Sequence, residues 1–334
     1  MSTLKAARRE PAPRDQQRLF DVGISDLADL REQKEALMTK AKAPNTLRAY
    51  KHAWKGFHDW CGMTGRNSLP VDPETIELFL TWGANERGYR KETLALALSA
   101  IQDKHLSAGY PSPLTASVRA VQAGIVRERR EGFNGKDAVR VEHLRKICRR
   151  LSADDDPIHI RDRAIILVGF ASAWRRCELS AMQVEHAKFE KQGARLWLPY
   201  SKGDQEGKGE ETELVYAKDP KICPVRALKA WLKVRGLTPG PMFCSCNPLR
   251  EILYQSISGQ RIADIVKAEL KRIGEDPNKY GAHSLRSGMI TAAARRNVPL
   301  PAIMQHSRHK QVQTVIRYVR RELPFRRNVL ARVL

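Results

Sequence analysis

The chain has 334 residues, enough for about two domains of ordinary size and a sizeable core. Its 59 Lys and Arg against 37 Asp and Glu give a net charge of +22, and 42% of the residues are hydrophobic, which excludes a disordered basic tail and favours a folded protein with a polyanionic partner. No apolar stretch reaches the length of a membrane span and no secretory leader is visible, so we expect no membrane association and a cytoplasmic location.

The N-terminal part of the chain has a helical pattern. Residues 1–43 are polar and charged, and they predict an N-terminal arm with one short helix that ends before Pro44. At 44–131, apolar side chains recur every three or four positions, which predicts a small helical domain. Asn45 and Thr46 are the candidate cap residues of its first helix. Three further helices are predicted to begin after Pro73, at Lys91 and at Thr115.

A charged stretch with two glycines at 132–139 is the predicted linker to a larger domain at 140–334. The elements expected first in that domain are helices over 141–151 and 160–173 and two strands at 195–200 and 212–216, joined by a charged hairpin loop. The expected fold is mainly α with a small antiparallel β-sheet in the C-terminal domain. Two lobes joined by a flexible segment, on a chain this basic, favour a two-domain clamp on duplex DNA.

Several familiar catalytic sites have no counterpart in the sequence. There is no P-loop for a nucleotide, no H-E-x-x-H zinc motif, no G-x-S-x-G nucleophile motif and no Rossmann glycine fingerprint. Cys223, Cys244 and Cys246 lie near one another, but no second Cys or His pair completes a zinc site at a usual spacing. We therefore expect ordinary thiols, no metal site and no cofactor.

Two short segments in the middle of the chain carry charged residues that are candidates for a functional site. Arg175 and Glu178 are one helical turn apart, so the carboxylate can hold the guanidinium in place. Lys202 lies at the tip of the predicted hairpin. Taken alone, the segment with Arg175 could be a solvated basic corner. Lys202 taken alone could be an ordinary lysine in a turn.

Two further segments lie in the last sixty residues. His283 and Arg286 are one helical turn apart and can point into one site. His306, His309 and Tyr318 follow on a basic stretch. Each has an ordinary alternative, because a histidine is often structural and a lone tyrosine on a helix usually belongs to a core or an interface.

In this order, the residues resemble the motifs of the tyrosine recombinases of the phage integrase family. Arg175 and Glu178 match the family's first arginine motif, Lys202 its hairpin lysine, and His283 with Arg286 its His-x-x-Arg pair. Tyr318 takes the position of the nucleophile. The resemblance covers about 44–330, by motif in the C-terminal half and by layout in the N-terminal half.

The spacing within the family pattern selects one of the two later histidines. His309 lies 26 residues after His283 and nine before Tyr318, which fits the family, whereas His306 does not. The sequence departs from the family at two places. Ala173-Trp174 replaces the usual Gly-Leu before the first arginine, and Arg308 replaces the glycine that usually precedes the second histidine.

The resemblance implies DNA strand transfer through a 3′-phosphotyrosyl intermediate, without metal or ATP. The implied catalytic residues are Arg175, Lys202, His283, Arg286, His309 and Tyr318, with Glu178 orienting Arg175. In this scheme the tyrosine attacks the phosphate, His283 accepts or orients its proton, and the lysine protonates the leaving 5′-oxygen. The two arginines and His309 stabilise the charge on the phosphate oxygens.

The resemblance also implies partners. The N-terminal domain resembles the family's core-binding domain, and the candidate DNA contacts are Arg48, Lys51, Lys55, Arg90, Lys91 and Lys104. Apolar residues in the tail after residue 320 are expected to dock on a neighbouring protomer, which gives dimers on a double-stranded DNA site and a tetramer in the synapse. A nucleoid-associated protein of bacterial or phage-like origin is expected.

The leading hypothesis is therefore a site-specific recombinase for integration or excision of a mobile element, or for resolution of replicon dimers. A type IB-like topoisomerase or a telomere resolvase would share the chemistry. A non-catalytic DNA-binding protein on the same fold is the alternative from another class, and an RNA-binding protein fits the charge but shows no RNA motif.

Overall fold

The computed structural model describes residues 27–129, 135–201, 204 and 207–322 of the chain. It contains two compact units, residues 1–134 and 135–334. Most of the predicted N-terminal arm and the predicted docking tail lie outside the described residues. Among the described residues, no helix combines the length and the apolar character that a bilayer crossing requires.

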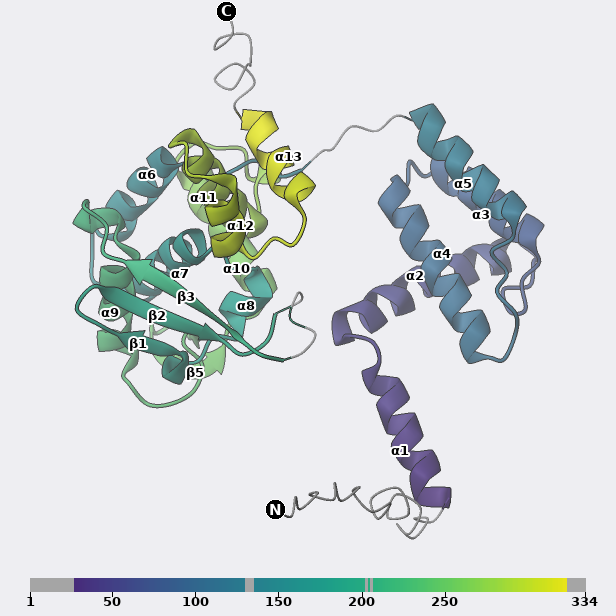
Figure 1. The fold of residues 1–334 in the computed structure, drawn as a ribbon, viewed down its shortest axis with the longest axis horizontal. Helices are drawn as coiled ribbons and strands as arrows, with labels where there is room; N and C mark the ends of the chain where they lie inside the picture. The colour runs from purple at the N-terminus through teal and green to yellow at the C-terminus, as the bar shows by residue number, and fades with distance from the viewer. Residues whose placement is uncertain (1–26, 130–134, 202–203, 205–206, 323–334) are drawn as a thin grey trace, which may run out of the picture. The chain divides into compact units, whose positions relative to one another are not determined.

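Helices make up the described part of the first unit (Figure 1). They are α1 (Leu27–Lys40), α2 (Pro44–Thr64), α3 (Pro73–Asn85), α4 (Lys91–Ser107) and α5 (Ala116–Arg129). All were expected, α2 to α5 from the periodicity and α1 as the short helix that ends before Pro44. The predicted caps of α2 were wrong, because Ala43 is its N-cap and Pro44 occupies the first turn, where the missing N–H costs no hydrogen bond. At α3 the Asp72 carboxylate accepts a hydrogen bond from the Thr75 N–H, 2.8 Å away.

The core of the first unit is aromatic and lies among α2, α3 and α4. Phe57, Trp60 and Phe79 are buried, with the rings of Phe57 and Phe79 edge to face at 5.1 Å. His105 is buried as well, and its Nε2 accepts the Val71 backbone N–H at 2.9 Å, so this histidine serves the fold.

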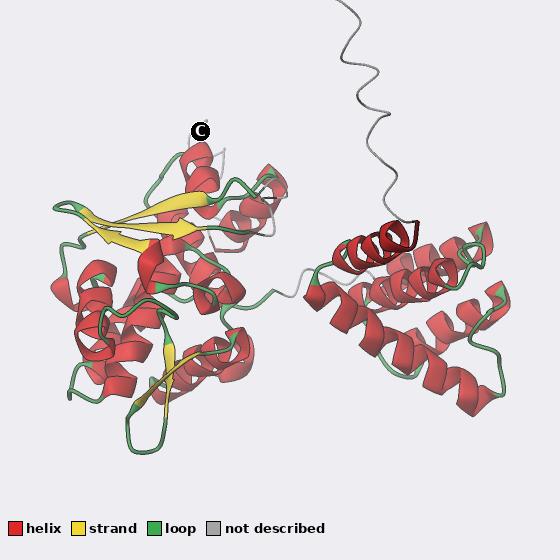
Figure 2. Cartoon of the chain, turned by 90° about the horizontal axis from the view of Figure 1, so that it is seen from below, coloured by secondary structure: helices red, strands yellow, loops and turns green. Residues whose placement is uncertain are grey.

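The second unit is mainly helical with two small antiparallel sheets, which confirms the predicted fold class (Figure 2). Its helices are α6 (Val141–Leu151), α7 (Pro157–Ser172), α8 (Arg176–Ser180), α9 (Pro224–Arg235), α10 (Gly259–Arg272), α11 (His283–Arg295), α12 (Leu300–Ser307) and α13 (Val312–Glu322). Its strands are β1 (Ala187–Phe189), β2 (Gly193–Leu198), β3 (Glu210–Val215), β4 (Cys244–Cys246) and β5 (Ile252–Ser256).

The predicted hairpin exists, but it is part of a larger sheet. β2 pairs antiparallel with β3, with Leu196 opposite Thr212, and β1 adds a third strand on the other side of β2. β1 and the β4–β5 pair were not predicted, because they are only three to five residues long and carry no clear alternation.

Helix α7 is the central support of the second unit. It is buried along most of its length and packs against α6, α9 and α11. At its C-terminal end the chain turns at Ala173 and enters α8. Helix α11 packs against both α7 and α13. Residues at the ends of these elements therefore meet although they are distant in sequence.

Gly288 makes the close approach between α11 and the preceding chain possible. A Cβ atom at this position would lie 2.1 Å from the carbonyl oxygen of Val139. We expect Gly288→Ala to lower the free energy of unfolding by about 1–3 kcal/mol, as overpacking does, measured by urea unfolding. The control is Gly124→Ala on the exposed side of α5, where no atom lies within 4 Å and alanine should stabilise the helix by up to about 1 kcal/mol. Stabilisation by both substitutions would contradict the close packing.

Candidate active site

Arg286 lies among the predicted catalytic residues that the fold of the second unit brings together. Its side chain is 1% exposed. One guanidinium nitrogen donates to the Ala173 carbonyl at 2.6 Å, and another donates to the Ser307 carbonyl. Through these two hydrogen bonds, the rigid, planar guanidinium links the turn after α7 to the end of α12.

Arg175 lies beside this centre, at the start of α8. Its Nη1 donates to Oε1 of Glu178 at 2.8 Å, and its backbone N–H donates to Oε2 of the same carboxylate at 2.7 Å. Glu178 is buried, so the carboxylate fixes both the backbone and the guanidinium of Arg175. The Arg175 side chain remains 30% exposed and open to an anion.

Tyr318 faces His283 across the site. Its hydroxyl lies 2.6 Å from His283 Nε2, and the tyrosine ring packs on the small apolar cluster formed by α11, α12 and α13. The ring centroids of His283 and His309 lie 6.0 and 6.1 Å from that of Tyr318. The hydroxyl is therefore within proton-transfer distance of a ring nitrogen.

The two later histidines have different environments. His309 Nδ1 lies 2.7 Å from the Ser307 hydroxyl, and both of its ring nitrogens lie within 3.4 Å of Arg286 Nη2. His306 instead contacts the Ala171 carbonyl at 2.7 Å through Nε2. The geometry brings His309 to the tyrosine, in agreement with the sequence spacing.

The positive charge of the site shifts the pKa values of its titratable groups. Burial, then Arg286 and Arg175, lowers the pKa of His309 to about 4, and the same causes lower the pKa of His283 below its usual value. Burial raises the pKa of Tyr318, although Arg286 and Arg175 oppose this effect. Burial and the neighbouring Arg175 lower the pKa of Arg286 to about 10. Near neutral pH Arg286 is therefore charged, and His283 and His309 are neutral.

Both departures from the family's glycine pattern fall on left-handed backbone. Ala173 has φ 53° and Arg308 has φ 55°, in the region that glycine adopts without strain. Each residue closes the helix before it, α7 and α12 respectively. The role of Arg308 had no signal in the sequence, yet its Nη2 donates to Glu178 Oε2 at 2.7 Å.

Lys202 lies outside the described residues, in the connection between β2 and β3. Strand β3, which follows that connection, is held close to the site, because Trp174 Nε1 donates to Thr212 Oγ1 of β3 at 2.9 Å. Trp174 is buried and directly precedes Arg175.

The candidate DNA contacts lie on two helices of the first unit. Arg48, Lys51 and Lys55 are exposed and spaced by three and four residues, so they share one face of α2. Arg90 and Lys91 are at the start of α4, and Lys104 is in its last turn. Lys55 also forms an ion pair with Asp59 at 2.6 Å.

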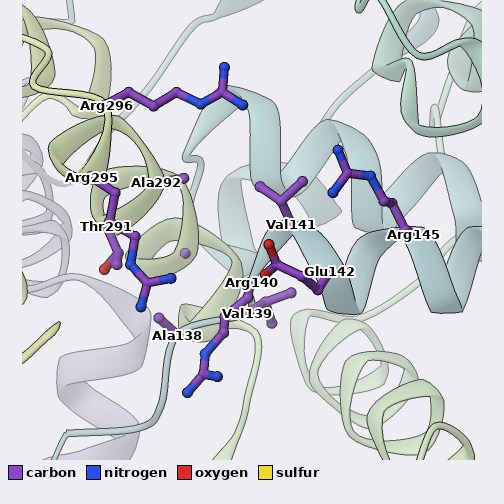
Figure 3. A pocket seen from close by; sticks show the side chains of 11 residues that line it. Ala138, Val139, Arg140, Val141, Glu142, Arg145, Thr291, Ala292, Arg295 and Arg296 are labelled. Carbon is purple, nitrogen blue, oxygen red and sulfur yellow. The ribbon is translucent and has the colours of Figure 1, made fainter.

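A separate pocket of about 130 Å³ lies between α6 and α11 (Figure 3). Its arginines are Arg140, Arg145, Arg295 and Arg296. None of the predicted catalytic residues lines it, so this pocket is separate from the tyrosine site. Across the described parts of the chain, no three His, Cys, Asp or Glu side chains gather as a metal site would require.

Comparisons with known proteins identify the family of the chain. Residues 138–323 match the profile of the phage integrase family. An integrase/recombinase XerD homolog from Selenomonas ruminantium is 35% identical over 300 residues, which covers 89% of this chain and 87% of that protein. The recombinase Cre of Escherichia phage P1 is 22% identical, over 81% of this chain and 84% of that protein.

Solved structures share the fold. A lambda integrase dimer bound to a COC′ core site has a TM-score of 0.60 at 15% identity and covers 87% of this chain and 93% of that chain. XerH recombinase bound to palindromic difH substrate in a post-cleavage complex has a TM-score of 0.57 at 16% identity, over 86% and 78% of the two chains.

Proposed function

The chain belongs to the phage integrase family and is a tyrosine-type site-specific recombinase, and from this premise we propose that Tyr318 is its nucleophile toward a DNA phosphate. The observation that carries the proposal is the 2.6 Å contact between the Tyr318 hydroxyl and His283 Nε2, next to Arg175 and Arg286. A hydroxyl, a base and two guanidiniums in one place are what phosphoryl transfer without a metal requires.

In the proposed step, the Tyr318 oxygen forms a bond to phosphorus while the bond from phosphorus to the 5′-oxygen breaks. The phenolic proton passes to His283, and Lys202 donates a proton to the leaving 5′-oxygen, which becomes a 5′-hydroxyl. Arg175 and Arg286 bind the non-bridging oxygens, with a hydrogen bond from His309. The phosphotyrosyl bond keeps the phosphodiester energy, so the reverse attack by a 5′-hydroxyl rejoins the strand.

Duplex DNA is the proposed substrate, contacted by both units. Arg48, Lys51, Lys55, Arg90, Lys91 and Lys104 are the proposed contacts of the first unit. The net charge of +22 supports strong, salt-dependent phosphate binding. A related lambda integrase is known as a tetramer bound to a Holliday junction, which supports dimers on the site and a tetramer in the synapse. Integration or excision of a mobile element, or resolution of replicon dimers, is the proposed use.

The rate of covalent attachment should depend on pH through His283. Its pKa is lowered, so the ring stays neutral and able to accept the tyrosyl proton below pH 6.5, and it loses that ability only when the pH falls below the shifted value. We expect the second-order rate constant of attachment to fall about tenfold per pH unit on an acid limb whose midpoint lies below pH 6.5. A stopped-time pH series with His283→Asn as control measures this. An acid limb above pH 6.5, or one retained in the variant, would assign the limb to another group.

Covalent trapping tests the proposed function. The protein is incubated with nicked duplexes of random sequence, from which the released 5′ fragment is lost after cleavage. We expect a protein–DNA adduct that survives denaturation in SDS, and sequencing of the trapped DNA then begins to define the site. Tight DNA binding without any adduct would instead favour the non-catalytic DNA-binding alternative.

A further inference from the structure

Arg308 occupies an unusual position at the end of α12. Its backbone is left-handed, with φ 55°, and its N–H donates to the Gln305 carbonyl at 3.2 Å to close the helix. A residue with a side chain is strained in this conformation, and it persists there only when contacts with its surroundings stabilise it. The contacts of the side chain show what holds it.

The guanidinium of Arg308 is buried between three parts of the second unit. Its side chain is 9% exposed. Nη2 donates to Glu178 Oε2 of α8 at 2.7 Å, and Nε lies 3.4 Å from an oxygen of Glu210, the first residue of β3. The guanidinium carbon lies 5.6 Å from the centroid of the Trp174 ring, which precedes Arg175.

Glu178 is the shared partner in this arrangement. Its two oxygens accept from the backbone and guanidinium of Arg175, and one of them also accepts from Arg308. Burial alone would raise the pKa of Glu178, but Arg308, followed by the hydrogen bonds from Arg175, outweighs it and the pKa is lowered. The carboxylate is therefore ionised at neutral pH and bonded to both cations.

Arg308 is also directly joined to the rest of the site. The next residue is His309, which contacts Arg286 and packs near Tyr318. Glu210, on the other side, ends the connection from β2 that contains Lys202. Through one side chain, the segment that carries His309 is tied to the arginine motif and to the base of the hairpin.

We propose that Arg308 is a positioning residue that sets the distance between the Arg175–Glu178 pair and the His309–Tyr318 segment. This inference rests on the proposed function and extends it to a residue whose side chain contacts Glu178, Glu210 and Trp174. Glycine at this position would close α12 with less strain, but it would remove the direct contacts of this segment with Glu178 and Glu210. A displacement of about 1 Å between reacting groups costs about 100-fold in rate.

The test compares Arg308→Gly with wild type in single-turnover attachment at saturating nicked DNA of the trapped sequence. We expect the rate constant to fall about 100-fold, while the Kd for DNA changes by less than about threefold. The Tm is measured beside it, because loss of the buried Glu178 ion pair and relief of the backbone strain act on stability in opposite directions. Arg308→Lys, which keeps the charge, should recover about a tenth of the wild-type rate. Glu210→Gln, which leaves the Glu178 contact in place, should lose about tenfold.

The matched control is Arg250→Gly. Arg250 is also an arginine at positive φ, 71°, but it lies in the turn between β4 and β5 and pairs with Asp156. Its rate constant should stay within twofold of wild type. An Arg308→Gly protein that attaches DNA within threefold of wild type would overturn the proposal, as would an equal loss for glycine and lysine together with a lower Tm. If the wild type itself formed no adduct, the proposed function and not the role of Arg308 would fail.

Discussion

Tyr318→Phe should abolish covalent attachment to DNA and leave DNA binding almost unchanged. The substitution removes only the hydroxyl, which lies 2.6 Å from His283 Nε2, and keeps the ring that packs on the cluster formed by α11, α12 and α13. No other described hydroxyl, amine or thiol takes this place between His283 and the two arginines, so we expect the adduct to fall by at least about 10⁴-fold, as for the loss of an enzyme nucleophile.

The measurement is SDS gel analysis of trapped adducts beside a filter or mobility assay of DNA affinity. The matched control is Tyr110→Phe, since Tyr110 is a half-exposed tyrosine in the first unit, next to His105. It should form adducts at the wild-type rate. An adduct that survived in the Tyr318 variant would mean that another residue is the nucleophile.

The environment of the Tyr318 hydroxyl explains why its attack on a phosphate requires a neighbouring base. Its pKa is raised by burial, so the phenolate is scarce at neutral pH and a base must take the proton during attack. His283 is neutral for the same physical reason, since burial and two nearby arginines disfavour its charged form. One cluster of guanidiniums thus keeps the base unprotonated and holds positive charge for the phosphate.

Sequence periodicity predicted the helices well where their ends are determined locally. Helix α6 has the predicted bounds, and Asp72 with Pro73 marks the start of α3. The cap of α2 was misplaced because Asn45 and Thr46 are good cap residues in general, while the proline before them already fits the first turn. The short strands of the second unit were missed because pairing partners, not local propensity, determine them.

The motif spacing selected candidate residues that, apart from Lys202, lie close together in the described structure, but their geometry could not be predicted. Spacing selected His309, and the structural reason is the left-handed turn at Arg308, which ends α12 and directs the next side chain toward Arg286. Arginine itself gives no local signal for that turn, since it disfavours the left-handed region, although the family usually has glycine at this position. The contact between Arg308 and Glu178 spans 130 residues and joins the end of α12 to α8, so it depends on tertiary packing that no local pattern encodes.

Arg286→Lys is expected to inactivate the protein although it keeps the positive charge. The guanidinium is 1% exposed and donates in two directions, to the Ala173 and Ser307 carbonyls, which a single ammonium on a flexible stem cannot reproduce. We expect the rate of covalent attachment to fall about 10³-fold, as when a charge-stabilising donor is misplaced. The buried carbonyl left without a donor should lower the free energy of unfolding by about 1–3 kcal/mol.

Single-turnover trapping and urea unfolding measure the two effects separately, with Arg296→Lys as the control. Arg296 follows the same helix, α11, but is exposed, so its replacement should change the rate by less than about twofold and the free energy of unfolding by less than about 0.5 kcal/mol. If Arg286→Lys kept a rate within tenfold of wild type, charge alone would suffice at this position. The expected large loss, with charge unchanged, would instead assign the effect to donor geometry, because the lysine variant differs from wild type chiefly in where its N–H groups point.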